Sequence, residues 1–143
     1  MINHLETEYK LLVSKEQFEQ LSTLYPDKTF VPQSNTYYDT MDMQLRQLKC
    51  AMRIREKENT FLFTLKTPDP HGHLEHECLV SENSCEVFKV DPIKSLLNEL
   101  GIHGEIIMVT YLKTYRAVVN TGCAELCFDI NEYNGITDYE IEY

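Results

Sequence analysis

Apolar and polar residues alternate along most of this chain, and a period of two predicts strands because successive strand side chains point to opposite faces. In the segment 50–56, for example, Met52 and Ile54 share one face while Arg53 and Arg55 share the other. The same alternation predicts strands over residues 5–13, 35–39, 50–56, 61–67, 74–80, 106–120, 123–130 and 137–143.

Two segments depart from this period and predict helices. Residues 15–25 place Phe18 on an apolar side, and Ser14 precedes them as an N-cap. Residues 91–100 repeat apolar side chains at helical spacing, and Gly101 ends that segment. The segment 40–49, between the predicted strands 35–39 and 50–56, is expected to be irregular.

Short turns between the strands favour antiparallel neighbours. The turn signals are Glu58-Asn59, Thr121-Gly122 and Asn134-Gly135. Together the elements predict an α+β fold with an antiparallel, closed or nearly closed β-barrel of about eight strands and flanking helices.

Charged residues recur two positions apart, so a strand that carries them presents its charges on one face. Glu6, Glu8 and Lys10 form the first such set. The later ones are Arg53/Arg55, Lys66, Glu75/Glu77, Arg116 and Glu140/Glu142. Same-face neighbours lie about 6.5–7 Å apart, where two like charges repel by about 2.4 kcal/mol at an effective dielectric constant of about 20.

Such faces fit two arrangements. Exposed to water, the repulsion is screened and the faces are simply the solvated side of a sheet. Turned into a barrel, they need opposite charges or bound ions. Carboxylate pairs suit divalent cations, and arginine pairs suit phosphate oxygens. Spacing alone leaves both arrangements open and favours the solvated one.

The composition narrows the class of protein. The 143 residues are 43% apolar and 25% charged, which suits one globular core. The net charge of −10 disfavours general nucleic-acid binding, and no apolar run is long enough for a transmembrane span. The N-terminus lacks signal-peptide features, and five cysteines without Cys-x-x-Cys spacing are expected as reduced thiols. We therefore expect a cytoplasmic protein.

An ordered set of short motifs resembles the CYTH superfamily, the triphosphate tunnel metalloenzymes. The motifs are Glu6-Thr7-Glu8-Tyr9-Lys10, Asn35-Thr36-Tyr37-Tyr38-Asp39-Thr40, Ala51-Met52-Arg53-Ile54-Arg55-Glu56, Phe63-Thr64-Leu65-Lys66, Glu75-His76-Glu77, Tyr115-Arg116 and Tyr139-Glu140-Ile141-Glu142. One such motif is weakly specific, whereas the ordered set covers nearly the whole chain. The likeness is greatest to short CYTH proteins of Gram-positive bacteria.

The resemblance implies one tunnel domain over residues 1–143, lined by the charged faces and lacking the family's C-terminal helical segment. The residues that it implies for triphosphate binding are Lys10, Arg53, Arg55, Lys66 and Arg116. Those implied for Mg²⁺ or Mn²⁺ are Glu6, Glu8, Glu140 and Glu142, supported by Glu75, Glu77 and Asp129. Among them, the expected catalytic residues are Glu6, Glu8 and Lys66.

The expected function is therefore divalent-metal-dependent hydrolysis of a triphosphate-containing substrate, either inorganic tripolyphosphate or a nucleoside or organic triphosphate. Two alternatives stay open: a class IV-type adenylate cyclase that makes cyclic AMP from ATP, and a noncatalytic module that binds polyphosphate or a nucleotide. The expected partner is the small-molecule substrate, with no nucleic acid and no membrane, and a homodimer stays open.

Three histidines near the predicted 68–73 loop could suggest a transition-metal site. An exposed turn is the expectation for His71 and His73, and alternation turns His76 away from its neighbours Glu75 and Glu77. We do not expect these histidines to bind a metal.

Overall fold

The computed structural model describes residues 1–143 and contains nine strands, three α-helices and one 3-10 helix. The chain divides into two compact units. Unit 1 comprises Met1–Thr7 and Asn35–Tyr111, and unit 2 comprises Glu8–Ser34 and Leu112–Tyr143. The sheet order is β1-β6-β5-β4-β3-β7-β8-β9-β2. The predicted α+β class is confirmed, with nine strands in place of about eight.

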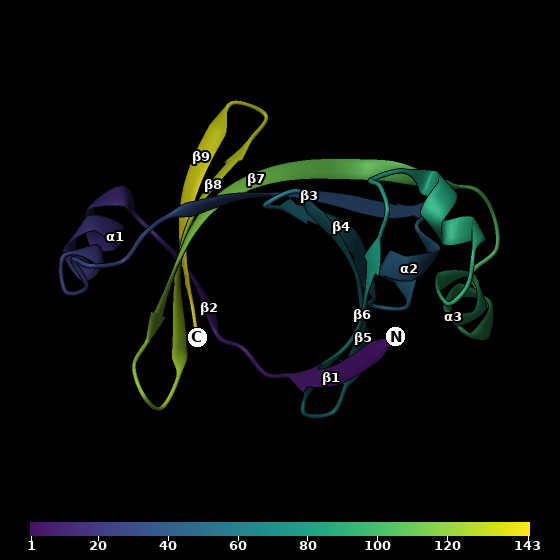
Figure 1. The fold of residues 1–143 in the computed structure, drawn as a ribbon, viewed down its shortest axis with the longest axis horizontal. Helices are drawn as coiled ribbons and strands as arrows, with labels where there is room; N and C mark the ends of the chain where they lie inside the picture. Colours follow the sequence, from purple (N-terminus) through teal and green to yellow (C-terminus); the bar gives the residue numbers. More distant parts are fainter. The chain divides into compact units, whose positions relative to one another are not determined.

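Unit 1 buries one face of its strands under its helices. The elements that lie wholly in it are β1 (Ile2–Glu6), α2 (Gln44–Gln47), β4 (Ala51–Lys57), β5 (Thr60–Asp69), β6 (Gly72–Val80), η1 (Cys85–Lys89) and α3 (Ile93–Glu99). Figure 1 shows β4, β5 and β6 as neighbours, and their pairing is antiparallel. Ile54, Phe63 and Leu65 are fully buried and share a core with Leu45 of α2 and Phe88 of η1. The alternate residues of these strands are therefore on the opposite face.

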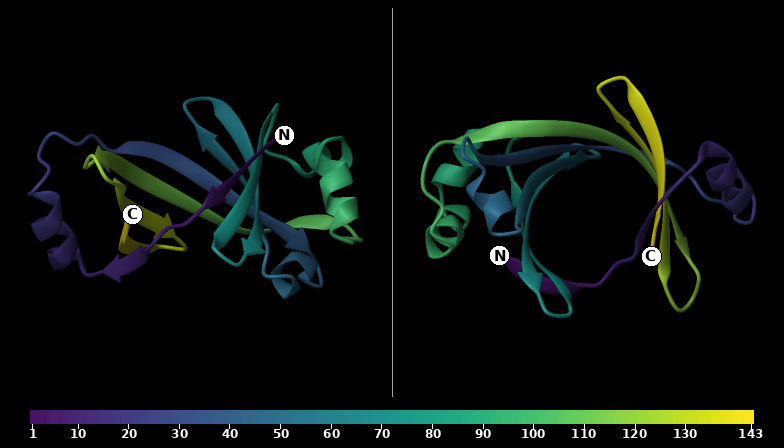
Figure 2. Two further views of the ribbon diagram at one scale, coloured as in Figure 1. Left: turned by 90° about the horizontal axis from the view of Figure 1, so that it is seen from below. Right: turned by 180° about the vertical axis from the view of Figure 1, so that it is seen from behind.

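Unit 2 has its own core beneath a single helix. Its complete elements are β2 (Lys10–Val13), α1 (Lys15–Ser22), β8 (Glu125–Tyr133) and β9 (Ile136–Glu142). Figure 2 shows β8 and β9 as a hairpin, in yellow. Phe18 of α1 packs against Phe128 and Tyr139 with ring centroids 5.7 and 5.1 Å apart. The remaining strands, β3 (Val31–Thr40) and β7 (Ile106–Asn120), contribute residues to both units.

The predicted caps and turns are largely confirmed. Ser14 caps α1, because its hydroxyl accepts from the backbone of Gln17 while the Gln17 side chain accepts from the backbone of Ser14. Asn134 and Gly135 both have positive φ in the β8–β9 turn. Helix α1 ends at Ser22, earlier than predicted, and Leu24 beyond it is exposed.

The prediction of one continuous strand over residues 5–13 is wrong. The segment forms two strands, β1 paired with β6 and β2 paired with β9. At the end of β1 the Glu6 carbonyl approaches Gly72 so closely that no Cβ would fit there, and the Thr7 hydroxyl donates to the carbonyl of His71. The chain leaves β6 after these contacts and begins β2 at Lys10.

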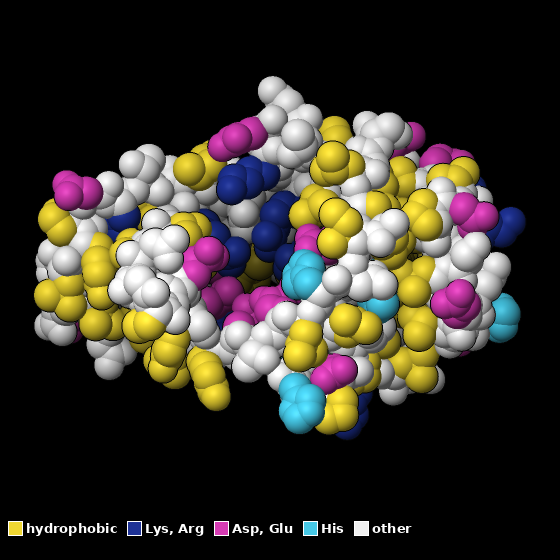
Figure 3. Space-filling model, turned by 60° about the horizontal axis from the view of Figure 1, so that its bottom comes forward, with side chains coloured by type: hydrophobic (Ala, Val, Ile, Leu, Met, Phe, Trp, Pro, Cys, Tyr) yellow, Lys and Arg dark blue, Asp and Glu magenta, His cyan; other side chains and the backbone are white.

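The segment 40–49, expected to be irregular, contains the short helix α2. None of the helices has both the length and the apolar character that crossing a membrane requires. Large apolar side chains nevertheless reach the surface, as the yellow areas of Figure 3 show. Ile2 and Leu12 on the two edge strands are among the most exposed.

Candidate functional site

The register of four strands assembles a charged face in unit 1. Lys66 on β5 lies opposite Glu75 on β6, which lies opposite His4 on β1. One step along, Arg53 on β4 lies opposite Thr64 on β5. Cross-strand partners share a face of the sheet, so these side chains gather opposite the apolar core of unit 1.

Lys66 contacts two of the carboxylates on this face. Its Nζ lies 3.4 Å from Oε2 of Glu6 and 3.8 Å from Oε1 of Glu75. The side chain of Glu75 is only 6% exposed, so its charge has lost most of its hydration. The ammonium group of Lys66 therefore offsets the repulsion between the two carboxylates.

His4 also contacts the acidic residues of β6. Its Nδ1 lies 3.2 Å from Oε1 of Glu77, and its Nε2 lies 3.6 Å from Oε2 of Glu75. Sequence analysis did not select His4, because the first strand was expected to begin only at residue 5. The signal was present: His4 is two positions before Glu6, so alternation places both side chains on one face once β1 is extended to Ile2.

Arg53 and Arg55 supply further positive charge to the charged face of unit 1. Arg55 Nε donates to Oδ1 of Asn35 at 2.8 Å, and Asn35 itself is buried. The Nε of Arg53 is buried without a hydrogen-bond partner. A buried donor of this kind is costly unless a ligand pairs with it, and a guanidinium matches the oxygens of a phosphate.

Unit 2 contains a second charged face, on β7, β8 and β9. Arg116 on β7 lies opposite Asp129 on β8 and donates two hydrogen bonds of 2.7 Å to its carboxylate, from Nε and Nη2. Nη2 also lies 3.4 Å from Oε2 of Glu142. Burial alone would lower the pKa of Arg116, but the hydrogen bonds and the charge of Asp129 raise it well above its usual value.

Lys10 on β2 completes the charged face of unit 2. Its Nζ lies 3.3 Å from Oε1 of Glu142 and 3.7 Å from Oε2 of Glu140. Burial acts to lower the pKa of Lys10, while the charges of Glu142, Glu140 and Glu8 raise it, and the net shift is upward. Burial is the main effect that raises the pKa of the Glu140 carboxyl. The nearby charge of Glu142 raises this pKa further, whereas the charge of Lys10 acts to lower it.

Each charged face holds a group of side chains whose ligand atoms lie within 4.8 Å of one another. In unit 1 the group is His4, Glu6 and Glu75; in unit 2 it is Asp129, Glu140 and Glu142. Clustered carboxylate oxygens are donors that divalent cations prefer, so both groups fit a divalent metal ion.

Most of the residues predicted for the site are therefore brought together within their own units. In unit 1 these are Glu6, Arg53, Arg55, Lys66, Glu75 and Glu77; in unit 2 they are Lys10, Arg116, Asp129, Glu140 and Glu142. Glu8 belongs to unit 2, between β1 and β2, and is no longer on a common strand with Glu6. The fully solvated alternative is wrong for Glu75, Asp129 and Glu142, which are buried.

The predicted placement of the three histidines agrees with the structure in part. His76 lies on the core side of β6, buried, with Nδ1 2.9 Å from Oδ1 of Asn3. Burial lowers its pKa, so it is neutral at physiological pH. His71 is exposed in the turn before β6, as predicted, whereas His73 is exposed but belongs to β6 and not to a turn.

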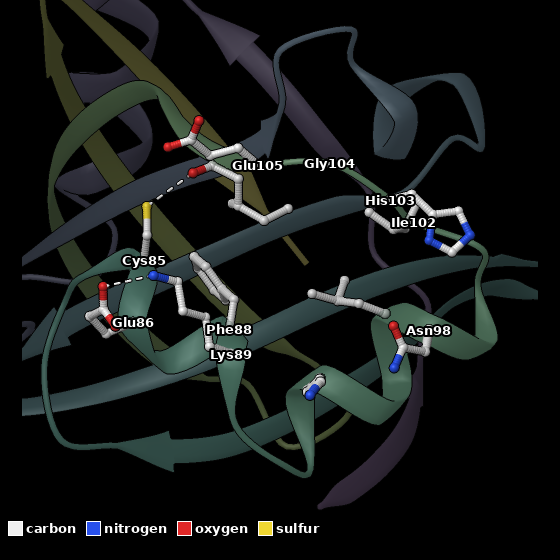
Figure 4. Close-up of a pocket in the computed structure, with 12 residues that line it drawn as sticks. Cys85, Glu86, Phe88, Lys89, Asn98, Ile102, His103, Gly104 and Glu105 are labelled. Carbon is white, nitrogen blue, oxygen red and sulfur yellow. Dashed lines mark hydrogen bonds and ion pairs between the residues drawn. The ribbon is translucent and has the colours of Figure 1, made fainter.

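A cavity of about 560 Å³ lies elsewhere in unit 1, between η1, α3 and the start of β7 (Figure 4). Phe88, Leu97 and Ile102 form its apolar part, and its Lys89 is paired with Glu86 at 2.9 Å. None of the predicted site residues lines this cavity. The charged faces, rather than this cavity, are the candidate site.

Residues 4–143 match the family model of the CYTH domain. The chain belongs to the CYTH family. This confirms the resemblance that the motifs suggested, including the Gram-positive relatives. The Bacillus subtilis (strain 168) protein named "Putative triphosphatase YjbK" is 33% identical over 149 residues, which cover all of this CYTH chain and 78% of YjbK.

Solved structures agree with this assignment. A Bacillus halodurans protein, described as a "putative adenylate cyclase", is 36% identical with a TM-score of 0.89, covering 99% of this CYTH chain and 81% of that protein. HpAC1 from Hippeastrum is 23% identical with a TM-score of 0.70, covering 94% of this chain and 77% of HpAC1. The latter likeness shows a shared fold.

Proposed function

We propose that this CYTH chain is a divalent-metal-dependent hydrolase of a triphosphate-containing substrate. The observation that carries the proposal is the direct contact of basic side chains with clustered carboxylates on both charged faces. A metal complex of a triphosphate needs both kinds of group, cations for the phosphate oxygens and carboxylates for the metal. The name of YjbK, a relative at 33% identity, supports the same class of reaction.

The proposed roles follow the chemistry of the side chains. The residues proposed to bind phosphate oxygens are Lys10, Arg53, Arg55, Lys66 and Arg116. Those proposed to hold Mg²⁺ or Mn²⁺ are Glu6, Glu8, Glu140 and Glu142, with Glu75, Glu77 and Asp129 in support. A bound divalent cation would neutralise phosphate charge and favour in-line attack by water.

Lys66 has a defined part in this proposal. Its ammonium already lies between the carboxylates of Glu6 and Glu75, where it is held by two ion pairs. From that position it can donate hydrogen bonds to a phosphate oxygen and stabilise the charge that spreads over the transferred phosphoryl group.

The test follows phosphate, pyrophosphate and cyclic AMP after incubation with tripolyphosphate, ATP or thiamine triphosphate and either Mg²⁺ or Mn²⁺. We expect metal-dependent phosphate release, and a loss of roughly 100-fold or more in kcat/KM for Lys66→Ala and for Glu8→Ala. The matched controls are Lys89→Ala and Glu86→Ala, which remove an exposed ion pair of the same chemistry and should keep full activity. No turnover of any of the three substrates would contradict the proposal.

Cyclase activity is the second candidate, because the Bacillus halodurans relative at 36% identity is described as a putative adenylate cyclase. The same assay separates the two reactions, since a cyclase releases pyrophosphate and cyclic AMP from ATP, whereas a hydrolase of the terminal phosphate releases phosphate. Tight binding of tripolyphosphate without turnover would instead identify a binding module.

A further inference from the structure

A buried amide joins β7, β8 and β9 on the charged face of unit 2. The register places Thr114 of β7 opposite Asn131 of β8, and Asn131 opposite Asp138 of β9. Two positions along the strands, Asp129 lies opposite Glu140, so both rows share one face. Asn131 is only 4% exposed, and its amide therefore needs hydrogen-bond partners within the protein.

The two groups of this amide have partners of matching chemistry. Nδ2 of Asn131 donates to Oδ1 of Asp138 at 2.9 Å and to Oε1 of Glu140 at 3.0 Å. Its Oδ1 accepts from the hydroxyl of Thr114 at 2.7 Å. An ionised carboxylate can only accept, so the NH₂ group has to face the two carboxylates and the carbonyl has to face the hydroxyl. Asp138 is held in turn, because its Oδ2 accepts from the hydroxyl of Tyr133 at 2.8 Å.

The two oxygens of Glu140 consequently have different neighbours. Oε1 accepts from Asn131, whereas Oε2 lies 3.7 Å from Nζ of Lys10. The ligand atoms of Asp129, Glu140 and Glu142 lie within 4.8 Å of one another. Carboxylates this close repel, and a glutamate side chain has other rotamers through which it could turn away. The hydrogen bond from Asn131 opposes that movement.

We infer that Asn131 is a positioning residue of the candidate site: its amide holds the Glu140 carboxylate in the acidic group of unit 2. The inference rests on the proposed function and adds a residue that neither the charge pattern nor the family resemblance selected. Asn131 does not itself contact the ion or the phosphate in this account. Loss of a hydrogen-bond partner of a metal-ligating side chain typically costs about 10- to 100-fold in metal affinity or activity.

The test measures Mn²⁺ binding to the full chain by isothermal titration calorimetry, after removal of metal with a chelator and without any triphosphate. Every chain tested carries Glu6→Gln, which weakens the acidic group of unit 1 and leaves that of unit 2 to dominate the signal. Asn131→Ala should lower the affinity for Mn²⁺ about 10-fold. The control Asn98→Ala removes an exposed amide of α3 and should keep the affinity unchanged.

A double-mutant cycle separates positioning from a general structural effect. If Asn131 acts through Glu140, Asn131→Ala should change the affinity less than 2-fold, on the order of the error of the cycle, in a chain that already carries Glu140→Ala. A purely structural role would instead give the same loss in both backgrounds. Circular dichroism of each metal-free variant checks that the fold is intact.

Thr114→Val provides a second variant should Asn131→Ala fail to fold. It keeps the volume of the buried side chain but removes the donor to Oδ1 of Asn131, so the amide is held less firmly. We expect a loss of about 3-fold in Mn²⁺ affinity, again absent in the Glu140→Ala background.

An affinity equal to that of the parent chain in the folded variants, or equal losses with and without Glu140, would overturn the inference. A coupled loss of affinity in a protein that hydrolyses no triphosphate would leave the inference standing and contradict the proposed function. Hydrolysis by the wild type together with uncoupled affinities would do the reverse.

Discussion

At the scale of single residues, Arg116 is the most tightly held cation of the candidate site. Its two hydrogen bonds of 2.7 Å to Asp129 join a guanidinium and a carboxylate whose side chain is only 3% exposed. A buried pair of this kind adds little net stability over an apolar pair, but removing one partner leaves a buried charge uncompensated. Arg116 therefore has a structural role in addition to any contact with substrate.

We predict that Arg116→Ala lowers the free energy of unfolding by about 3–5 kcal/mol, because Asp129 and Glu142 then lose their cation. Urea denaturation followed by circular dichroism measures the change. Lys89→Ala is the control, since Lys89 is exposed and pairs only at the surface, and its unfolding curve should overlay that of the wild type. A loss below about 1 kcal/mol for Arg116→Ala would show that the pair is weakly coupled to folding.

The thiol of Cys85 gives a prediction about pH. Burial, followed by the charge of Glu105, raises the pKa of Cys85, and its Sγ lies 3.2 Å from the carbonyl of Ile106 (Figure 4). A raised pKa reduces the thiolate fraction below that pKa, and the thiolate is the nucleophile. At pH 8 we expect iodoacetamide to modify Cys85 about 10-fold more slowly than the exposed Cys123.

Peptide mass spectrometry over a time course measures both rates in one sample. The rate at Cys85 should keep rising as the pH increases beyond the usual thiol range, because more thiolate forms only there. Equal rates at the two cysteines at pH 8, or a plateau for Cys85 below that range, would contradict this account.

At the scale of elements, the end of β3 is tied to the start of α2 by one carboxylate. Asp39 is buried and accepts hydrogen bonds from the backbone N–H groups of Thr40, Leu45 and Arg46, at 2.7, 2.9 and 3.1 Å. These contacts give a structural reason for the aspartate in the motif that begins at Asn35. They also place Leu45 in the core of unit 1.

We predict that Asp39→Ala lowers the free energy of unfolding by about 3 kcal/mol, because buried N–H groups lose a charged acceptor. Hydrogen exchange should show faster exchange at Leu45 and Arg46 than in the wild type. The control Asp42→Ala alters an exposed carboxylate in the same loop and should leave the exchange at Leu45 unchanged. If both variants behave alike, Asp39 does not anchor the helix.

The elements whose bounds the sequence predicted best are the strands β4, β5 and β7. Strand β7 has the predicted bounds 106–120, β4 keeps its predicted length but is shifted by one residue, and β5 is three residues longer than predicted. The break between β1 and β2 was not predictable from alternation, because it depends on which distant strand each half pairs with. Helix α2 was missed for a similar reason: it has only four residues, and two of them, Leu45 and Arg46, are held by hydrogen bonds to Asp39 rather than by a periodicity of their own.

The candidate site, like the fold, was predicted from the sequence only in part. Alternation placed Arg53 and Arg55 on one face of their strand, but it could not show that Lys66 pairs with Glu6, which requires the β1–β6–β5 register. Asp129 was only a supporting residue in the sequence analysis, although it is the main partner of Arg116. Contacts across strands depend on tertiary pairing, which a single strand pattern does not contain.

At the scale of the whole molecule, the chain has a net charge of −10, and both acidic clusters contribute to it. Self-repulsion of this kind lowers the stability of the folded state, and bound cations relieve it. A ligand that binds only the folded state adds about 2.7 kcal/mol of stability at 100 times its Kd. Metal binding should therefore be visible in the stability of the entire chain.

We predict that saturating Mn²⁺ raises the Tm of the chelator-treated protein by about 5–10 °C, with a further rise when tripolyphosphate is added. Differential scanning calorimetry measures the shift, and excess chelator should reverse it. Sodium chloride at equal ionic strength is the control, because it screens charge without occupying a ligand site. A shift of equal size with sodium chloride would mean that Mn²⁺ acts by general screening, whereas a specific shift lost on combining Glu6→Gln with Glu140→Gln would assign it to the two carboxylate clusters.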